Sequence, residues 1–315
     1  MTNRKQLLTG MGQAILATLI WSGNYIVARG VHSQISPVSL AFFRWLTASL
    51  LLLPMAPRVF RTQGPLMWKH RWKILVTALT GVSLFNTFIY VGGHSTTAIN
   101  LALIGTTAAP VFSIVLARIF LREQVGLSKI AGVILCFGGI LLLISQGDWR
   151  NLPALRFSAG DLWVLLAAFW FAVYTLLART RPAELAPLPF LAVCFWTGTL
   201  LLFPAYWIER THFPPIRWTG SLAGIVLYLG AGASILAFYL WNLALPRLGA
   251  GRTALLGNLI PLFSTVEAVI LLGETFRSAQ AYGMALILAG VLTASVPVLL
   301  PARFGRPGVR GTQES

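Results

Sequence analysis

The sequence predicts an all-α integral membrane protein with ten transmembrane helices in two inverted five-helix repeats. Hydrophobic residues make up 57% of the chain and charged residues only 10%, whereas soluble domains carry about 25% charged residues. Apolar runs of about 20 residues, long enough to cross a bilayer as helix, recur along the whole chain. One passage is written twice: PVFSIVLARIFLRE at 110–123 and PLFSTVEAVILLGE at 261–274 share eight of fourteen positions.

Five predicted spans form the first half, at residues 11–30, 36–55, 73–92, 98–120 and 127–145. The short basic N-terminus runs straight into the first span without a signal-peptide cleavage site, so we expect this span to be retained. A basic loop is expected between the second and third spans. The polar linker SQGDWRNLPALRFSAGD then leads to the second half, with spans predicted at 161–179, 187–207, 219–242, 252–272 and 280–300.

The repeated passage indicates two homologous domains, at 11–145 and 161–300. The same offset of 151 residues places Gly132 and Gly139 of the fifth span on two glycines of the tenth, and small residues spaced by seven favour close packing on one helix face. Because each half holds an odd number of spans, equivalent helices cross the membrane in opposite senses. Secondary transporters use such inverted repeats around a midplane binding site.

The distribution of charge explains the formal net charge of +16. If both termini lie on one side, that side carries seventeen of the 24 Lys and Arg residues, including those of a basic tail at 301–315, and the other side carries six. The positive-inside rule then places both termini and the tail in the cytoplasm. The basicity is therefore a topology signal, and we expect the lipid bilayer as partner rather than nucleic acid.

The motifs LIWSGNYIVARGV in the first span and SPVSLAFFRWLTASLLLLP in the second, together with the twice-written Pro-to-Glu helix, resemble the drug/metabolite transporter superfamily, specifically its EamA family. The resemblance covers residues 11–300. It implies a ten-helix exporter of small metabolites, often amino acids, in the bacterial cytoplasmic (inner) membrane. It does not imply which metabolite is carried.

Two charges lie well inside apolar runs, Arg44 in the second span and Glu267 in the ninth. A charge there is costly unless it faces a partner or a watery cavity, so both are candidate substrate-binding residues. At 1.5 Å per residue they lie in the outer half, roughly 12 and 8 Å deep, and an ion pair between them is left open. Glu267 replaces Leu116 of the first copy and is also a candidate for proton coupling. The alternative for Arg44 is a purely structural role.

Polar and aromatic residues at helical spacing predict the walls of a substrate cavity, in which rings supply area and amides supply orientation. They are Trp21, Asn24 and Tyr25 on the first span, Asn86 and Tyr90 on the third, and Trp170 and Tyr174 on the sixth. Asn258, just before the ninth-span proline, joins this candidate set. The alternative for the tryptophans is an interfacial belt at the membrane surface.

Pro110 and Pro261 are predicted helix hinges, because proline frees backbone carbonyls that protein or water must satisfy within the membrane. A static kink is the alternative. His94, just outside the third span, titrates near neutral pH and is a second candidate for proton coupling, against the alternative of a merely solvated side chain. Cys136 and Cys194 stand alone in apolar runs, without metal or redox spacing.

The sequence contains no phosphate-binding loop, no HExxH and no nucleophile elbow, so we expect no cofactor, no metal and no enzymatic activity. The predicted function is a secondary-active transporter that exports small organic solutes, foremost amino acids or related metabolites, by alternating access of the two repeats. A lipophilic-cation drug exporter and a channel or uniporter without alternating access are the alternatives. Transport direction, proton coupling and oligomeric state are not decided by the sequence.

Overall fold

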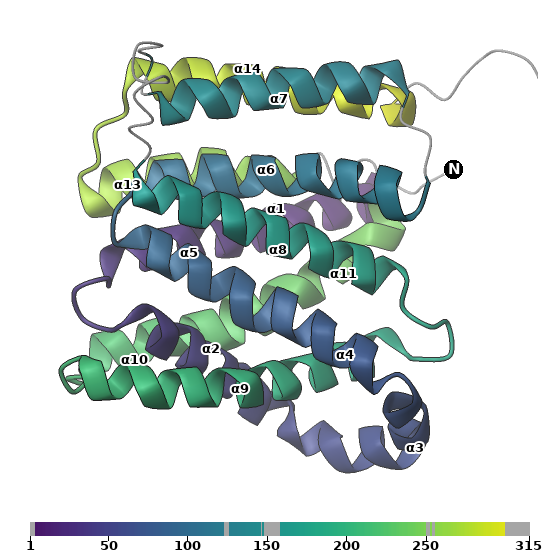
Figure 1. Cartoon of the computed structure of the whole chain (residues 1–315). Coiled ribbons are helices and arrows are strands. Elements are labelled where there is room, and N and C mark those ends of the chain that lie inside the picture. Colours follow the sequence, from purple (N-terminus) through teal and green to yellow (C-terminus); the bar gives the residue numbers. More distant parts are fainter. Residues whose placement is uncertain are drawn as a thin grey trace, which may run out of the picture.

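The computed structural model describes residues 4–122, 126–145, 147, 158–249, 253 and 256–299. All regular structure within these ranges is helical, which confirms the predicted all-α fold. Figure 1 shows the long helices running side by side in stacked layers. The predicted tail at 301–315 and Glu123, which ends the first copy of the repeated passage, lie outside the described residues.

Each predicted span coincides with a helix or with a run of joined helices. The first half comprises α1 (Arg4–Gly30), α2 (Pro37–Leu52), the 3-10 turn η1 (Leu53–Met55), α3 (Ala56–Lys69), α4 (Arg71–Ala78), the π-helix η2 (Leu79–Leu84), α5 (Phe85–Gly93), α6 (Ala98–Phe120) and α7 (Leu127–Ile144). The second half comprises α8 (Ala159–Arg179), α9 (Pro187–His212), α10 (Gly220–Leu227), the π-helix η4 (Tyr228–Leu236), α11 (Ala237–Leu248), α13 (Leu259–Leu272) and α14 (Ser278–Leu299).

Most helices are apolar enough to cross a membrane. Within the described residues, six helical stretches meet the length and hydropathy that a span requires, and three shorter apolar helices lie within α7, α13 and α14. The helix α1 is in neither group, since polar residues such as Gln13 and Asn24 interrupt its apolar run. The main core gathers side chains of both halves, among them Tyr90 of α5 and Val164 of α8.

The basic segment between the second and third spans is the helix α3, not the loop that the sequence predicts. Pro57 lies in its first turn, where the missing N–H of proline costs no helical hydrogen bond. Basic and apolar residues alternate along α3, so hydropathy alone does not reveal it. Val59 and Met67 nevertheless form a buried side, and α3 packs against α4 and α9 (Figure 1).

Carboxylates of the second half cap helices of the first. Glu209 of α9 accepts a hydrogen bond from the backbone N–H of Ser39 in α2 at 2.8 Å, and Glu274 accepts one from the N–H of Ala98 in α6 at 2.7 Å. The first N–H groups of a helix lack internal partners and attract negative charge. These two carboxylates therefore fix the starts of α2 and α6 against the other half of the chain.

The helices α7 and α14 form a close pair, seen at the top of Figure 1. A Cβ atom on Gly132 would lie 2.5 Å from the carbonyl oxygen of Gly290, and one on Gly139 would lie 2.9 Å from that of Gly283. Only glycine permits this backbone approach, so the predicted packing faces of the fifth and tenth spans meet each other.

Candidate functional site

A buried arginine joins α1, α2 and α5 of the first half to η4 of the second. Arg44 is 4% exposed. Its Nε donates to Ser234 Oγ at 2.9 Å, and its Nη1 donates to Asn24 Oδ1 at 2.6 Å and to the hydroxyl of Tyr90 at 2.9 Å. The Tyr90 hydroxyl donates in turn to Asn24 Oδ1 at 2.9 Å. Three predicted site residues thus meet in one hydrogen-bonded group, called here the Arg44 network (Arg44, Asn24, Tyr90 and Ser234).

A small cavity of about 40 Å³ adjoins the Arg44 network. Both halves line it: Arg44, Gly81 and Asn86 from the first, Tyr174 and Cys194 from the second, with the rings of Phe85, Phe171, Phe195 and Phe238. The Tyr174 ring packs directly on Gly81, where a Cβ would lie 2.2 Å from the ring. The cavity has room for about one or two water molecules, so the helices close tightly around it.

Polar atoms on the cavity wall lack partners. Asn86 is 2% exposed, and within the described chain its Oδ1 accepts no hydrogen bond. Trp45 also lines the cavity, and its buried Nε1 donates no hydrogen bond within the described chain. A buried polar group without a partner costs about 1–3 kcal/mol. The wall therefore offers one unpaired acceptor and one unpaired donor to a ligand, beside the charged guanidinium of Arg44.

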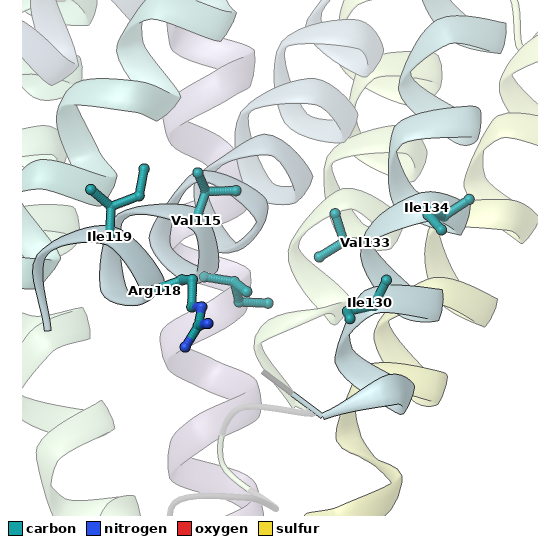
Figure 2. Close-up of a pocket in the computed structure, with 7 residues that line it drawn as sticks. Val115, Arg118, Ile119, Ile130, Val133 and Ile134 are labelled. Carbon is teal, nitrogen blue, oxygen red and sulfur yellow. The ribbon is translucent and has the colours of Figure 1, made fainter. Parts of the chain in front are cut away.

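A much larger hollow, of about 690 Å³, lies between α6 and α7. Figure 2 shows Val115, Arg118 and Ile119 on one helix and Ile130, Val133 and Ile134 on its neighbour. Apart from the arginine, its lining is aliphatic. A site for a polar solute needs several convergent polar groups, so this hollow suits lipid contact and not substrate recognition.

Glu267 lies apart from the cavity, on the contact between α13 and α1. Its Oε1 accepts a hydrogen bond from Ser22 Oγ at 2.8 Å, while its buried Oε2 has no partner among the described residues. Ser264 Oγ also donates to the Ser22 carbonyl at 3.2 Å. No salt bridge joins Glu267 to Arg44 in the described parts of the chain, because the hydrogen bonds of Arg44 go to the network. The ion pair that the sequence leaves open is not formed.

Of the predicted wall residues, Asn86 and Tyr174 line the cavity, whereas six do not: Asn24 and Tyr90, which belong to the Arg44 network, and Trp21, Tyr25, Trp170 and Asn258. Trp21 Nε1 donates to the Ala233 carbonyl at 3.0 Å, which ties α1 to η4. Tyr25 is 7% exposed and lies against Gly105 of α6. Trp170 is half-buried on α8. Trp21 and Tyr25 thus connect α1 to neighbouring helices beside the site.

The two predicted hinges differ in their surroundings. Pro110 lies inside the unbroken helix α6, whereas Pro261 lies in the first turn of α13, where proline removes no helical hydrogen bond. Asn258 directly precedes α13, and its side chain makes no capping hydrogen bond there. The equivalent prolines therefore mark an interior position in one half and a helix start in the other.

His94 is exposed at the end of α5, outside the membrane-spanning segment. Its ring lies 5.6 Å from that of His32. Partial burial, with the positive charges of His32 and Arg29, holds the pKa of His94 below its ordinary 6.5, partly opposed by Glu209. His94 belongs to a surface group that is separate from the Arg44 network.

Two residues of the site, Ser234 and Cys194, were not predicted. The sequence does contain a pattern that points to Cys194. Cys194 stands seven residues after Pro187, just as Arg44 stands seven residues after Pro37. Counted from the proline that begins each helix the two residues correspond, at an offset of 150 residues, one less than that of the repeated passage. Nothing in the sequence distinguishes Ser234 from other serines, because its role depends on how η4 packs against α2.

Comparison with known proteins agrees with this architecture. The model of the EamA-like transporter family matches residues 8–145 and again 158–296. An uncharacterized transporter of Archaeoglobus fulgidus is 29% identical over 278 residues, covering 88% of this chain and 93% of the relative. A probable amino-acid metabolite efflux pump of Salmonella typhimurium is 28% identical over 294 residues, covering 88% and 92%. One crystal structure shares the fold, with a TM-score of 0.58 at 20% identity, covering 93% of this chain and 98% of the other.

The two family matches together span most of the chain, and they fall on the two sets of apolar helices. Family and fold agree on a multi-pass membrane protein that acts on small molecules within a lipid bilayer, and they exclude an enzyme as its class. The resemblance seen in the sequence is confirmed: this chain belongs to the EamA-like transporter family.

Proposed function

We propose that this protein is a secondary-active exporter of amino acids or closely related metabolites, working by alternating access of two domains at 11–145 and 161–300. The observation that carries the proposal is the unsatisfied cavity wall. Asn86, with its unpaired Oδ1, and Trp45, with its unpaired Nε1, line the same cavity between the halves as the buried guanidinium of Arg44. A site between inverted repeats is where secondary transporters bind their cargo.

An α-amino acid matches this wall in charge and in hydrogen bonding. Its carboxylate would pair with the buried guanidinium of Arg44 and neutralise its charge. Its ammonium group would donate to Asn86 Oδ1 and lie near the faces of Phe171 and Tyr174, which attract cations. The relative described as a probable amino-acid metabolite efflux pump supports the same substrate class.

Binding requires the site to open, because a cavity of about 40 Å³ is smaller than any amino acid. The walls belong to α2, η2 and α5 on one side and to α8, α9 and α11 on the other. Separation of these groups of helices would admit the substrate from one face of the membrane at a time. Pro110 and Pro261 remain our proposed hinges for that motion.

Glu267 is the proposed proton-coupling residue. Its Oε2 is buried without a partner in the described chain, and its Oε1 is held by Ser22 of α1. Ser22 stands two residues from Asn24, which accepts from Arg44. A change in the protonation of Glu267 would therefore reach the Arg44 network through one turn of α1. His94 is the weaker candidate, since it is exposed and outside that network.

The substrate class is tested by counterflow in proteoliposomes, with the amino acid first chosen by thermal-shift screening, because ligand binding to the folded state raises its stability. We expect saturable exchange of labelled amino acid that an unlabelled internal pool accelerates, and its loss in Arg44→Gln. Exchange of lipophilic cations instead would favour the drug-exporter alternative, to which the unpaired Glu267 oxygen would then offer a counter-charge. Flux without saturation would identify a channel.

Proton coupling is tested separately with Glu267→Gln. We expect this variant to keep amino-acid exchange but to lose accumulation driven by a pH gradient, because the amide cannot take up the proton. Gradient-driven transport equal to that of the unmodified protein, with the same pH dependence, would remove Glu267 from the mechanism. The charge count favours cytoplasmic termini in the bacterial inner membrane, and the relative described as an efflux pump supports export as the direction.

A further inference from the structure

The helix α3 and the start of α4 carry a basic and aromatic surface that the transport site does not use. We call it the α3 surface and define it by Arg58, Arg61, Trp68, Lys69, Arg71 and Trp72, all of which are exposed. Residues 56–73 contain no Asp or Glu. The segment lies on the side that the charge count predicts to be cytoplasmic.

The helix α3 is held firmly against the protein by its opposite side. Val59 and Met67 are 3% and 5% exposed and belong to a buried cluster with Phe190 of α9. Gln63 Oε1 also accepts a hydrogen bond from the backbone N–H of Ala186, just before α9, at 3.1 Å. The outward side of α3 is therefore presented in one fixed orientation.

Basic residues and aromatic rings occupy different parts of that outward side. Arg58, Arg61 and Lys69 are spaced by three and by eight residues, which keeps them on one stripe of a helix with 3.6 residues per turn. Trp68 and Trp72, 72% and 68% exposed, lie beside this stripe. Exposed tryptophans next to basic residues are typical of a helix at the membrane surface.

A groove opens beside the two tryptophans. It has a volume of about 400 Å³ and runs between α3, α4 and α9, with Met67, Ile74 and Val193 in its wall. Arg71 is the charged residue in its lining, and the Arg71 guanidinium lies 5.2 Å from the Trp68 ring and 5.9 Å from the Trp72 ring. An apolar groove therefore ends at a positive charge held between two aromatic rings.

We propose that the α3 surface binds an anionic phospholipid, with an acyl chain in the groove and the phosphate beside Arg71, Arg58 and Arg61. The occupant follows from charge complementarity, because a surface with basic and no acidic residues adjoins an apolar groove. Each basic residue near an anionic lipid surface strengthens binding by about fivefold. A zwitterionic lipid would fill the groove equally well but would gain little from the arginines.

The test compares phosphatidylglycerol with phosphatidylcholine of identical acyl chains, each added to the purified full-length protein in neutral detergent. Bound lipid is counted by native mass spectrometry, and the thermal midpoint is measured in parallel. We expect phosphatidylglycerol to bind at least about tenfold more tightly, and Arg58→Gln/Arg61→Gln/Arg71→Gln together to remove that preference. Because these side chains are exposed, the triple variant should keep its midpoint in the absence of lipid.

Arg210→Gln is the matched control. Arg210 is exposed near the far end of α9, and its guanidinium lies 4.7 Å from the Trp207 ring, so it repeats the arginine–tryptophan contact away from α3. It should leave the lipid preference unchanged. Equal affinity for the two lipids, or an unchanged preference in the triple variant, would refute the site. A midpoint shift produced equally by glycerol phosphate would point to a phosphate site without a lipid.

Discussion

Asn24 and Asn86 are buried amides on neighbouring helices whose oxygen atoms are in opposite situations. Asn24 Oδ1 accepts from both Arg44 and Tyr90, at 2.6 and 2.9 Å, whereas Asn86 Oδ1 accepts from nothing in the described chain. The first amide stabilises the fold. The second costs stability in the empty protein, which is the expected signature of a group kept for a ligand.

Replacing Asn86 by Leu should therefore raise stability while removing function. Loss of the unpaired oxygen should raise the free energy of unfolding by about 1 kcal/mol, and amino-acid exchange should fall to background. Asn24→Leu is the control and should lower the thermal midpoint, because it leaves Arg44 short of an acceptor. Thermal unfolding and counterflow, measured on the same preparations, test this prediction. A lower thermal midpoint for Asn86→Leu would show that the Asn86 oxygen is hydrogen-bonded in the unmodified protein.

His94 gives a pH effect whose sign follows from its environment. The pKa of His94 in the folded protein lies below its ordinary 6.5, through partial burial and then the charges of His32 and Arg29, against the opposing charge of Glu209. The unfolded chain thus binds the proton more tightly, and stability falls as the pH drops below about 6.5. In His94→Gln this fall should be shallower, as measured by thermal midpoints between pH 7.5 and about 5.5. An equally steep fall in His94→Gln would show that other groups cause the loss of stability at low pH.

At the scale of the helix, two glycines of α7 show how differently the same residue is used. Gly132 lies against the α14 backbone, where a Cβ would come 2.5 Å from the Gly290 carbonyl oxygen. Gly138, on the same helix, has nothing within 4 Å of an added Cβ. Glycine is required at Gly132 by the contact with α14 and not by the conformation of α7 itself.

Gly132→Ala should accordingly separate α7 from α14 and lower the free energy of unfolding by about 1–3 kcal/mol. Gly138→Ala is the matched control and should be neutral or slightly stabilising, since alanine has the better helix propensity. Thermal midpoints in one detergent provide the comparison. Equal midpoints for the two variants would mean that the pair is not closely packed.

The sequence predicts some helices of this fold and misses others. Long apolar runs predicted the spans, because a bilayer demands one length and one composition. The same criterion failed for α3, whose apolar side is short and interrupted by arginines. Hydropathy also did not predict the π-helices η2 and η4, since an extra residue within a turn alters the hydrogen bonding of a helix without altering its composition.

For the molecule as a whole, the repeat relates parts of the candidate site in one half to parts in the other. Arg44 and Cys194 correspond when counted from the proline that begins each helix, and they line one cavity, and π-helices occur in the third helical run of each half. Charge in an apolar run identified Arg44, and helical spacing identified Asn24, Asn86, Tyr90 and Tyr174. Spacing could not separate these from Trp21 or Trp170, because it defines a helix face but not what that face meets.

Cys194 offers a direct measure of the whole-molecule motion. In a Cys136→Ser background it is the remaining cysteine of the chain, and it lines the cavity beside Arg44. Alkylation by a small maleimide should require the halves to open, and an amino acid at ten times its Kd should slow it by about tenfold. The reverse background, Cys194→Ser, should show no such protection. A rate indifferent to substrate would place the binding site elsewhere.

The glycine contact between α7 and α14 also imposes an order of events during synthesis. The helix α7 ends at Ile144 and its partner begins at Ser278, 134 residues later, so ribosomes adding about 5–20 residues per second complete α7 roughly 7 to 27 seconds before they begin α14. Throughout that interval α7 resides in the membrane with its narrow glycine surface against lipid or the insertion machinery. The contact between α7 and α14 therefore forms last, and it joins the end of the second domain to the end of the first.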